Sequence, residues 1–249
     1  MLAPDAELRE IVGYLKKLIL VNQETGIGVP PVPSGISRDP EEKASEGLLS
    51  STSFTDMDSL EKLSNHIGDC RRCKLYKGRT NLVFGEGLSS ARLVFVGEGP
   101  GKEEDMTGRP FVGEAGRLLT KIIEAMGLTR AKVYICNIVK CRPPGNRDPE
   151  SDEIEACIPF LEQQIRIIKP EVICILGRIA GQSLLGSDFR ITRDRGKWFS
   201  FMGIPVMPTF HPAFLTRSSG NRERELKRNV WDDMQMIMAR LGLEIKKNA

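Results

Sequence analysis

No stretch of this 249-residue sequence is long and apolar enough to span a membrane. A secretory leader is also missing, because the apolar run at residues 18–21 is too short and no cleavage site of small residues follows it. Neither sign of charge dominates, since 36 Lys and Arg against 33 Asp and Glu leave a net charge of +3. We therefore expect a soluble, cytoplasmic protein with no membrane partner, and we take it to be a monomer.

The sequence also lacks the second C-x2-C pair that would be typical of a zinc site. Cys70 and Cys73 form one such pair, but Cys141 and Cys157 are separated by 15 residues. Four thiolates from separate elements suit an iron–sulfur cluster as well as zinc, so spacing alone leaves both open, together with unligated core cysteines. The remaining two cysteines lie in apolar runs and are predicted to be small buried hydrophobes: Cys136 and Cys174.

The first quarter of the chain differs in composition from the rest. Residues 1–25 contain an amphipathic helical pattern, and residues 26–57 are rich in Gly, Pro, Ser and charge, which predicts a flexible linker. The helix is expected either to dock a protein partner or to fold back on the main domain, and the sequence favours neither. We place the folded domain at residues 58–243.

Buried strands and amphipathic helices alternate through this domain. The predicted strands are residues 93–96, 132–141, 172–176 and 204–210, and helices are expected between them and at residues 222–241. The two prolines of the last strand suggest an edge or strand-end position. Strands alternating with helices indicate an α/β fold with a largely parallel sheet covered on both faces.

The stretch from Arg92 to Gly113, RLVFVGEGPGKEEDMTGRPFVG, is the best candidate for a site. A strand leads into a tight turn predicted at residues 97–101, and open α/β sheets bind their ligands outside the carboxyl ends of the strands. A dinucleotide-binding turn is disfavoured, because Lys102 stands where G-x-G-x-x-G requires its third glycine.

Five ordered motifs between Ser59 and Leu241 carry a resemblance to a known family. They read CRRCKL, GEGPGKEEDMTGRPFVGEAGRLL, NIVKCRPPGNRDP, the helical Cys157 followed by PFL, and HPAFLTR. Together they resemble the family 4 uracil-DNA glycosylases. The resemblance implies a three-layer α/β/α sandwich with a central four-stranded, mainly parallel sheet. It also implies a [4Fe–4S] cluster, which it favours over zinc, held by Cys70, Cys73, Cys141 and Cys157.

Base removal requires the nucleotide to leave the stack and enter a pocket that reads the hydrogen-bonding edge of the base. By resemblance, the Asn137 amide is expected to match O4 and N3–H of uracil, and Phe111 to stack on the ring. The tight turn around Gly99 should exclude the methyl group of thymine, because an apolar pocket alone discriminates one methyl by only about 1–3 kcal/mol. The expected substrate is uracil in single- or double-stranded DNA.

Cleavage of the glycosidic bond builds positive charge on the sugar and negative charge on uracil. Glu98 is the first candidate for the carboxylate near the sugar, and Glu104 is a second candidate, for positioning water. His211 is expected to donate to O2 of the departing base and can do so in the neutral form. The product would be an abasic site, as in the first step of base excision repair of deaminated cytosine.

Two departures and one alternative accompany the resemblance. Many members of the family have alanine where this chain has Gly99, and Thr216 replaces a leucine of the last motif. No histidine lies between Arg190 and Trp198, so we expect turnover rather than the covalent product adduct of a sister group. The alternative is a non-catalytic iron–sulfur DNA-binding module, which Glu98, Asn137 and His211 disfavour.

Overall fold

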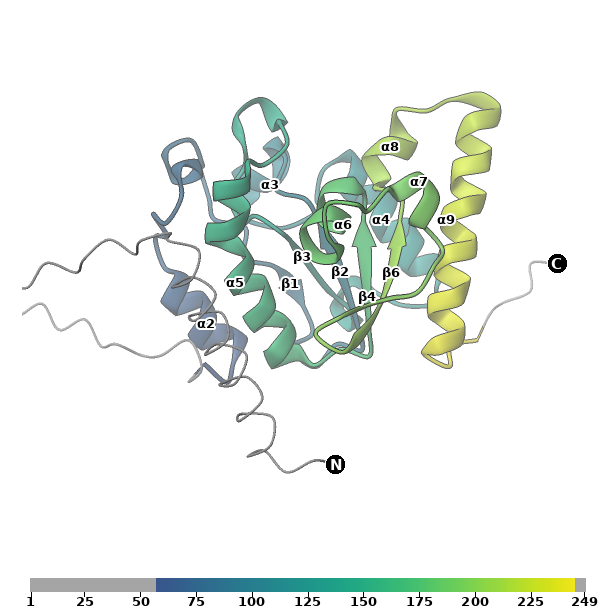
Figure 1. The fold of residues 1–249 in the computed structure, drawn as a ribbon, viewed down its shortest axis with the longest axis horizontal. Coiled ribbons are helices and arrows are strands. Elements are labelled where there is room, and N and C mark those ends of the chain that lie inside the picture. Colours follow the sequence, from purple (N-terminus) through teal and green to yellow (C-terminus); the bar gives the residue numbers. More distant parts are fainter. Residues whose placement is uncertain (1–56, 245–249) are drawn as a thin grey trace, which may run out of the picture. The chain divides into compact units, whose positions relative to one another are not determined.

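The structure is a computed structural model that describes residues 57–244 (Figure 1). The predicted N-terminal helix (1–25) and all but the last residue of the predicted linker (26–57) lie outside the described residues. None of the described helices is long and apolar enough to cross a membrane.

Strands and helices alternate along the described chain, as the sequence predicts. The strands are β1 (Glu86–Gly87), β2 (Leu93–Gly97), β3 (Tyr134–Asn137), β4 (Val172–Leu176), β5 (Phe199–Phe201) and β6 (Ile204–Thr209). The α-helices are α2 (Leu60–Ile67), α3 (Lys102–Thr107), α4 (Glu114–Ala125), α5 (Ser151–Ile168), α6 (Arg178–Leu185), α7 (Ile191–Asp194), α8 (Pro212–Thr216) and α9 (Gly220–Arg240). Short 3-10 helices are η2 (Lys74–Lys77), η3 (Arg130–Lys132) and η4 (Pro144–Asn146).

The six strands form one mixed sheet in the order β1-β3-β2-β4-β6-β5. The four central strands run parallel, and Gly97 of β2 lies opposite Asn137 of β3. The outer strands, β1 and β5, are antiparallel to their neighbours. The expected four-stranded parallel sheet is therefore present, with a short antiparallel strand added at each side.

Helices cover both faces of the sheet. Side chains of β2 point alternately to the two faces, so they pack in two separate hydrophobic cores. Leu93 and Phe95 pack with apolar residues of α4 and α9, whereas Val94 and Val96 pack with those of α5 and α6. A smaller cluster joins α2 to α5 through Leu63, Ile67 and Phe160. Figure 1 shows α2 and α5 on one side of the sheet and α9 on the other. The three-layer α/β/α prediction is confirmed.

Several local predictions differ from the structure. The strand predicted at residues 132–141 is shorter, because β3 spans only Tyr134–Asn137 and Lys132 ends the 3-10 helix η3. Of the two positions predicted for the proline-containing strand β6, the edge is wrong, because the short strand β5 pairs with it at residues 204–206. The strand-end alternative agrees with the structure, since Pro205 and Pro208 are the second and the second-to-last residues of β6. Gly97 does not belong to the turn but ends β2 in extended conformation. The acidic stretch Lys102–Thr107, which we expected to belong to the loop after the first strand, is the helix α3, whose first turn contains three acidic residues that favour the positive end of the helix dipole.

Candidate functional site

Two predicted base-binding residues meet at the carboxyl end of β2. The backbone of Gly97 passes so close to them that an added Cβ would lie 2.5 Å from Oδ1 of Asn137 and 2.5 Å from Cζ of Phe111. Both residues are buried, with 1% and 6% of their surface exposed. Among residues 57–244, Oδ1 of Asn137 is the one buried side-chain nitrogen or oxygen atom without a hydrogen-bond partner. A buried acceptor of this kind is costly unless a ligand supplies the donor.

His211 lies against the same corner from the other end of the chain. Its ring centroid is 5.7 Å from that of Phe111, and its Cβ is within 2.9 Å of a Cβ built on Gly177. His211 is the N-cap of α8, and its Nδ1 accepts from the backbone N–H of Ala213 at 3.1 Å. Because Nδ1 is an acceptor, the neutral ring carries its proton on Nε2 and can donate it to a ligand.

Burial keeps His211 neutral over the physiological range. It lowers the pKa of His211 to about 4, and the positive charge of Arg217 acts in the same direction while Glu104 opposes it. The imidazole is therefore a neutral hydrogen-bond donor at pH 7, not a cation.

Glu98 follows Gly97 directly and is partly buried at this corner. The pKa of Glu98 is raised to about 7, chiefly by burial and then by the nearby Asp148 carboxylate, while Arg178 and Arg217 act to lower it. A carboxyl group poised near neutral pH is typical of catalytic acids and bases. The fold thus brings Asn137, Phe111 and His211 together around Gly97. Glu98 adjoins this corner as the next residue in the chain, and Arg217 lowers the pKa of both Glu98 and His211.

Glu104 and Gly99 have other surroundings. Oε1 of Glu104 accepts from the backbone N–H groups of Val112 and Gly113, each at 2.8 Å, and Oε2 accepts from Gly101 at 3.1 Å. The carboxylate therefore ties the loop after Arg109 to the start of α3. A Cβ on Gly99 would lie 2.8 Å from Cγ2 of Val139, so an alanine here would require that side chain to shift.

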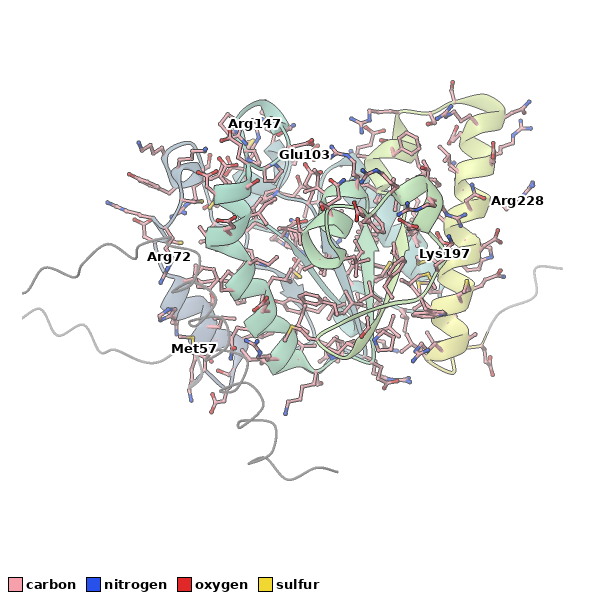
Figure 2. The ribbon with its side chains drawn as sticks, viewed as in Figure 1. Met57, Arg72, Glu103, Arg147, Lys197 and Arg228 are labelled. Carbon is pink, nitrogen blue, oxygen red and sulfur yellow. The ribbon has the colours of Figure 1, made fainter. Side chains whose placement is uncertain are left out.

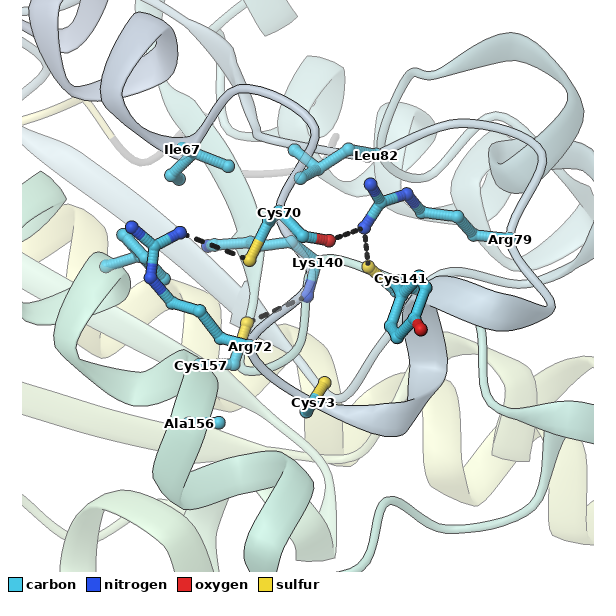
Figure 3. Close-up of a pocket in the computed structure, with 12 residues that line it drawn as sticks. Ile67, Cys70, Arg72, Cys73, Arg79, Leu82, Lys140, Cys141, Ala156 and Cys157 are labelled. Carbon is cyan, nitrogen blue, oxygen red and sulfur yellow. Dashed lines mark hydrogen bonds between the residues drawn. The ribbon is translucent and has the colours of Figure 1, made fainter. Parts of the chain in front are cut away.

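Four cysteines line one pocket between η2, the segment after β3, and α5 (Figure 3): Cys70, Cys73, Cys141 and Cys157. Nη1 of Arg72 donates to Sγ of Cys70 at 3.4 Å, and Nη1 of Arg79 donates to Sγ of Cys141 at 3.2 Å. The backbone N–H of Lys140 donates to Sγ of Cys157 at 3.3 Å. N–H groups aimed at sulfur stabilise thiolates, the form that binds metal.

This donor set fits an iron–sulfur cluster. In residues 57–244 no three His, Cys, Asp or Glu side chains converge as closely as a single metal ion requires, and a zinc ion would need its sulfur ligands at about 2.3 Å. Burial raises the pKa of the Cys157 thiol to about 11, while the charge of Lys140 and its backbone N–H act to lower it. A cluster accepts four thiolates that face one larger space, as Figure 3 shows them.

Basic side chains accompany the site at the carboxyl edge of the sheet. Figure 2 shows Arg147 at the end of the molecule toward which the central strands point, together with Glu103 of α3. Arg178 pairs with Asp148 at 2.5 Å, and the guanidinium of Arg222 lies 5.7 Å from the ring centroid of Phe214. Arginines at this edge of the sheet are suited to contacts with phosphates, although Arg147 and Arg178 are paired with Glu153 and Asp148 in this structure.

Residues 84–235 match the family model described as the uracil DNA glycosylase superfamily. The chain belongs to this superfamily. The resemblance inferred from the five motifs is thereby confirmed.

Curated relatives of this superfamily member span most of the described chain. A type-4 uracil-DNA glycosylase of Thermotoga maritima is 48% identical over 73% of this chain and 94% of its own length. One of Sulfurisphaera tokodaii is 53% identical over 63% of this chain and 76% of its own length. A third, of Saccharolobus solfataricus, is 48% identical over 63% of this chain and 77% of its own length.

Sequence reasoning missed several residues that support the site of this glycosylase-superfamily chain. Arg79 is nearly buried and binds Cys141 and the backbone of Cys70, yet it stands in an unremarkable basic stretch. Lys140 is fully buried and donates to the Asn137 carbonyl oxygen at 2.8 Å and to Gln164 at 2.7 Å. Its position directly before Cys141 was the only available signal.

Proposed function

We propose that this chain is a monofunctional uracil-DNA glycosylase, which flips uracil out of single- or double-stranded DNA and hydrolyses the N-glycosidic bond. The observation that carries the proposal is the unpartnered Oδ1 of buried Asn137 beside Phe111 and His211. Uracil N3–H is a donor for that oxygen, and the amide N–H₂ can donate to O4. Phe111 stacks on the extruded ring, a contact that contributes about 1–3 kcal/mol.

The other side chains act on the bond that breaks. His211 donates its Nε2 proton in a hydrogen bond to O2 of uracil, which stabilises the negative charge of the departing base. The Glu98 carboxylate stabilises the positive sugar and orients the water that attacks C1′. Glu104, whose oxygens accept from three backbone N–H groups, contributes by holding the loop that carries Phe111. The wall around Gly99 excludes the thymine methyl group.

The reaction ends at the abasic site, the first intermediate of base excision repair. Strand cleavage by a glycosylase needs an amine nucleophile near C1′. Lys140, three residues after Asn137, is fully buried and bound to Asn137 and Gln164. It is therefore held away from the sugar.

Cleavage of a labelled oligonucleotide with one deoxyuridine tests this function. With the protein in excess, the strand should break only after alkali, because the enzyme leaves an intact backbone at the abasic site. An otherwise identical oligonucleotide with thymidine at that position should stay whole. A deoxyuridine strand that survives both the protein and alkali would rule out the proposed activity.

We also propose that Cys70, Cys73, Cys141 and Cys157 hold a [4Fe–4S] cluster. The cluster would link three segments of the chain and would take no part in the chemistry on the base. Structural metal groups of this kind contribute directly to the free energy of folding. Anaerobically purified protein should be brown, contain iron and acid-labile sulfide, and lose its colour on acidification. Cys157→Ser should lower the iron content, whereas Cys174→Ala, at a buried cysteine outside the pocket, should not. Zinc in place of iron and sulfide would contradict the assignment.

A further inference from the structure

Phe111 has a backbone conformation that a large side chain rarely adopts. Its φ angle is 51°, in the left-handed region, although it is not a glycine. Such residues persist only where the surrounding structure holds them, and they cluster at functional sites. The aromatic ring beside Asn137 and His211 therefore depends on contacts to its own backbone.

The carbonyl side of this turn is held by Arg130, from the 3-10 helix η3. Nη1 of Arg130 donates to the carbonyl oxygen of Phe111 at 2.9 Å, and Nη2 donates to that of Pro110 at 2.7 Å. The planar guanidinium thus binds two consecutive carbonyl groups as a fork, a geometry that lysine cannot reproduce. The side chain is mostly buried, with 18% of its surface exposed.

The opposite side of the turn is held by Glu104, which accepts from the N–H groups of Val112 and Gly113. Gly116 of α4 fits under the same turn, because a Cβ there would lie 2.0 Å from the carbonyl carbon and oxygen of Phe111. The peptide groups on both sides of the ring are therefore fixed by buried or partly buried partners.

Glu86 of the edge strand β1 orients Arg130. Its Oε1 accepts from Nε of Arg130 at 3.4 Å, while it also forms a two-pronged pair with Arg109 at 2.7 and 2.9 Å. Arg109 shares this carboxylate but is exposed, and the hydrogen bonds of its guanidinium go to Glu86 rather than to the turn. Both arginines bind Glu86, but only Arg130 also donates to the backbone carbonyl oxygen of Phe111.

From these contacts we infer that Arg130 is a positioning residue for base recognition, which keeps the Phe111 ring in the place where it stacks on uracil. The inference rests on the proposed function. It predicts that Arg130 contributes to catalysis only while Phe111 is present, because the arginine acts through the ring and touches neither base nor sugar.

A double-mutant cycle tests this dependence with single-turnover rates on the deoxyuridine oligonucleotide. We expect Arg130→Gln to lower kcat/KM by about 10-fold, since small displacements of positioned groups have large effects on rate. Phe111→Ala should lower it by about 10–100-fold, the range of one base–aromatic contact. The double variant should be no more than about twofold slower than Phe111→Ala, because coupled residues are non-additive.

Two further variants separate positioning from loss of structure. Arg109→Gln, which also removes a partner of Glu86, should retain the wild-type rate and melting temperature. Arg130→Lys keeps the charge but loses the fork, so it should show a partial loss, and it replaces Arg130→Gln in the cycle if that variant melts below the assay temperature. Multiplicative effects of Arg130 and Phe111, or an equal loss in Arg109→Gln, would overturn the inference. An inactive wild-type protein would instead defeat the proposed function.

Discussion

Replacing His211 with alanine should slow uracil release by about 10²–10³-fold, the usual effect of removing one donor to a developing anion. The expectation follows from the tautomer: Ala213 N–H occupies Nδ1, so the Nε2 proton is the one presented to the base. Since the ring is uncharged at neutral pH, its loss should leave the affinity for DNA nearly unchanged. Single-turnover rates and fluorescence anisotropy with a labelled duplex measure the two effects separately.

His66 provides a control, because it is the other histidine of the chain and lies in α2, outside the corner formed by Gly97, Asn137 and Phe111. Its Nε2 lies 3.4 Å from Nη2 of Arg72, which also contacts Cys70, so the iron content of His66→Ala is measured as well. His66→Ala should keep the wild-type rate. If His211→Ala instead lost DNA binding in proportion to rate, the histidine would be supporting the structure of α8 rather than the chemistry.

The second large effect is expected for Glu98→Gln, which should lower the rate by about 10²–10⁴-fold if the carboxylate acts in the transition state. The wild-type rate should rise with pH through about 7 and level off roughly one pH unit above that, because the pKa of Glu98 is raised to about 7 and the carboxylate is the active form. Titration of His211 should not change the rate between pH 5 and 8, since the pKa of His211 is lowered to about 4. The residual rate of Glu98→Gln should therefore be flat between pH 5 and 8.

Glu98→Gln, which should lower the rate, should raise the stability of the folded protein at neutral and higher pH. The folded-state pKa of Glu98 lies above its ordinary value of 4.5, so the folded protein gains stability from this group at low pH and loses it as pH rises toward 7. Glutamine cannot ionise, so the Glu98→Gln variant does not lose this stability as the pH rises. Relative to wild type, Glu98→Gln should melt at a higher temperature at pH 8, with the difference shrinking toward pH 5.

Glu103→Gln is the control for both measurements, because Glu103 lies in the adjacent helix α3 with an exposed side chain. It should change neither the pH profile nor the melting temperature appreciably. A wild-type rate that is independent of pH from 5 to 8 would contradict the role given to Glu98.

Much of the fold could be predicted because its signals are local. The runs at residues 93–96 and 172–176 are buried on both faces of the sheet, so continuous apolar sequence identified them. The helix α3 was missed although its acidic first turn and the left-handed Gly108 at its end are recognisable signals. The position of β6 could not be predicted, because its outer neighbour is only the three-residue strand β5.

The site was less accessible to sequence reasoning, since it depends on tertiary proximity. Asn137, Glu98 and His211 are far apart in the chain, and the family motifs rather than their chemistry singled them out. The close approach of Gly97 to Asn137 and Phe111 has no sequence signal beyond the glycine itself. The role of Arg130 could not be predicted from the sequence for the same reason, because its partners are backbone carbonyl groups of another segment.

The shortness of β1 and β5 has a consequence beyond the site. These strands contain two and three residues, so neither border of the sheet offers a long row of free peptide groups. An incoming extended segment would find too few groups to pair with, which is how many natural β-sheets avoid fibrillar association. The two short border strands therefore disfavour pairing between the sheets of two copies of this chain.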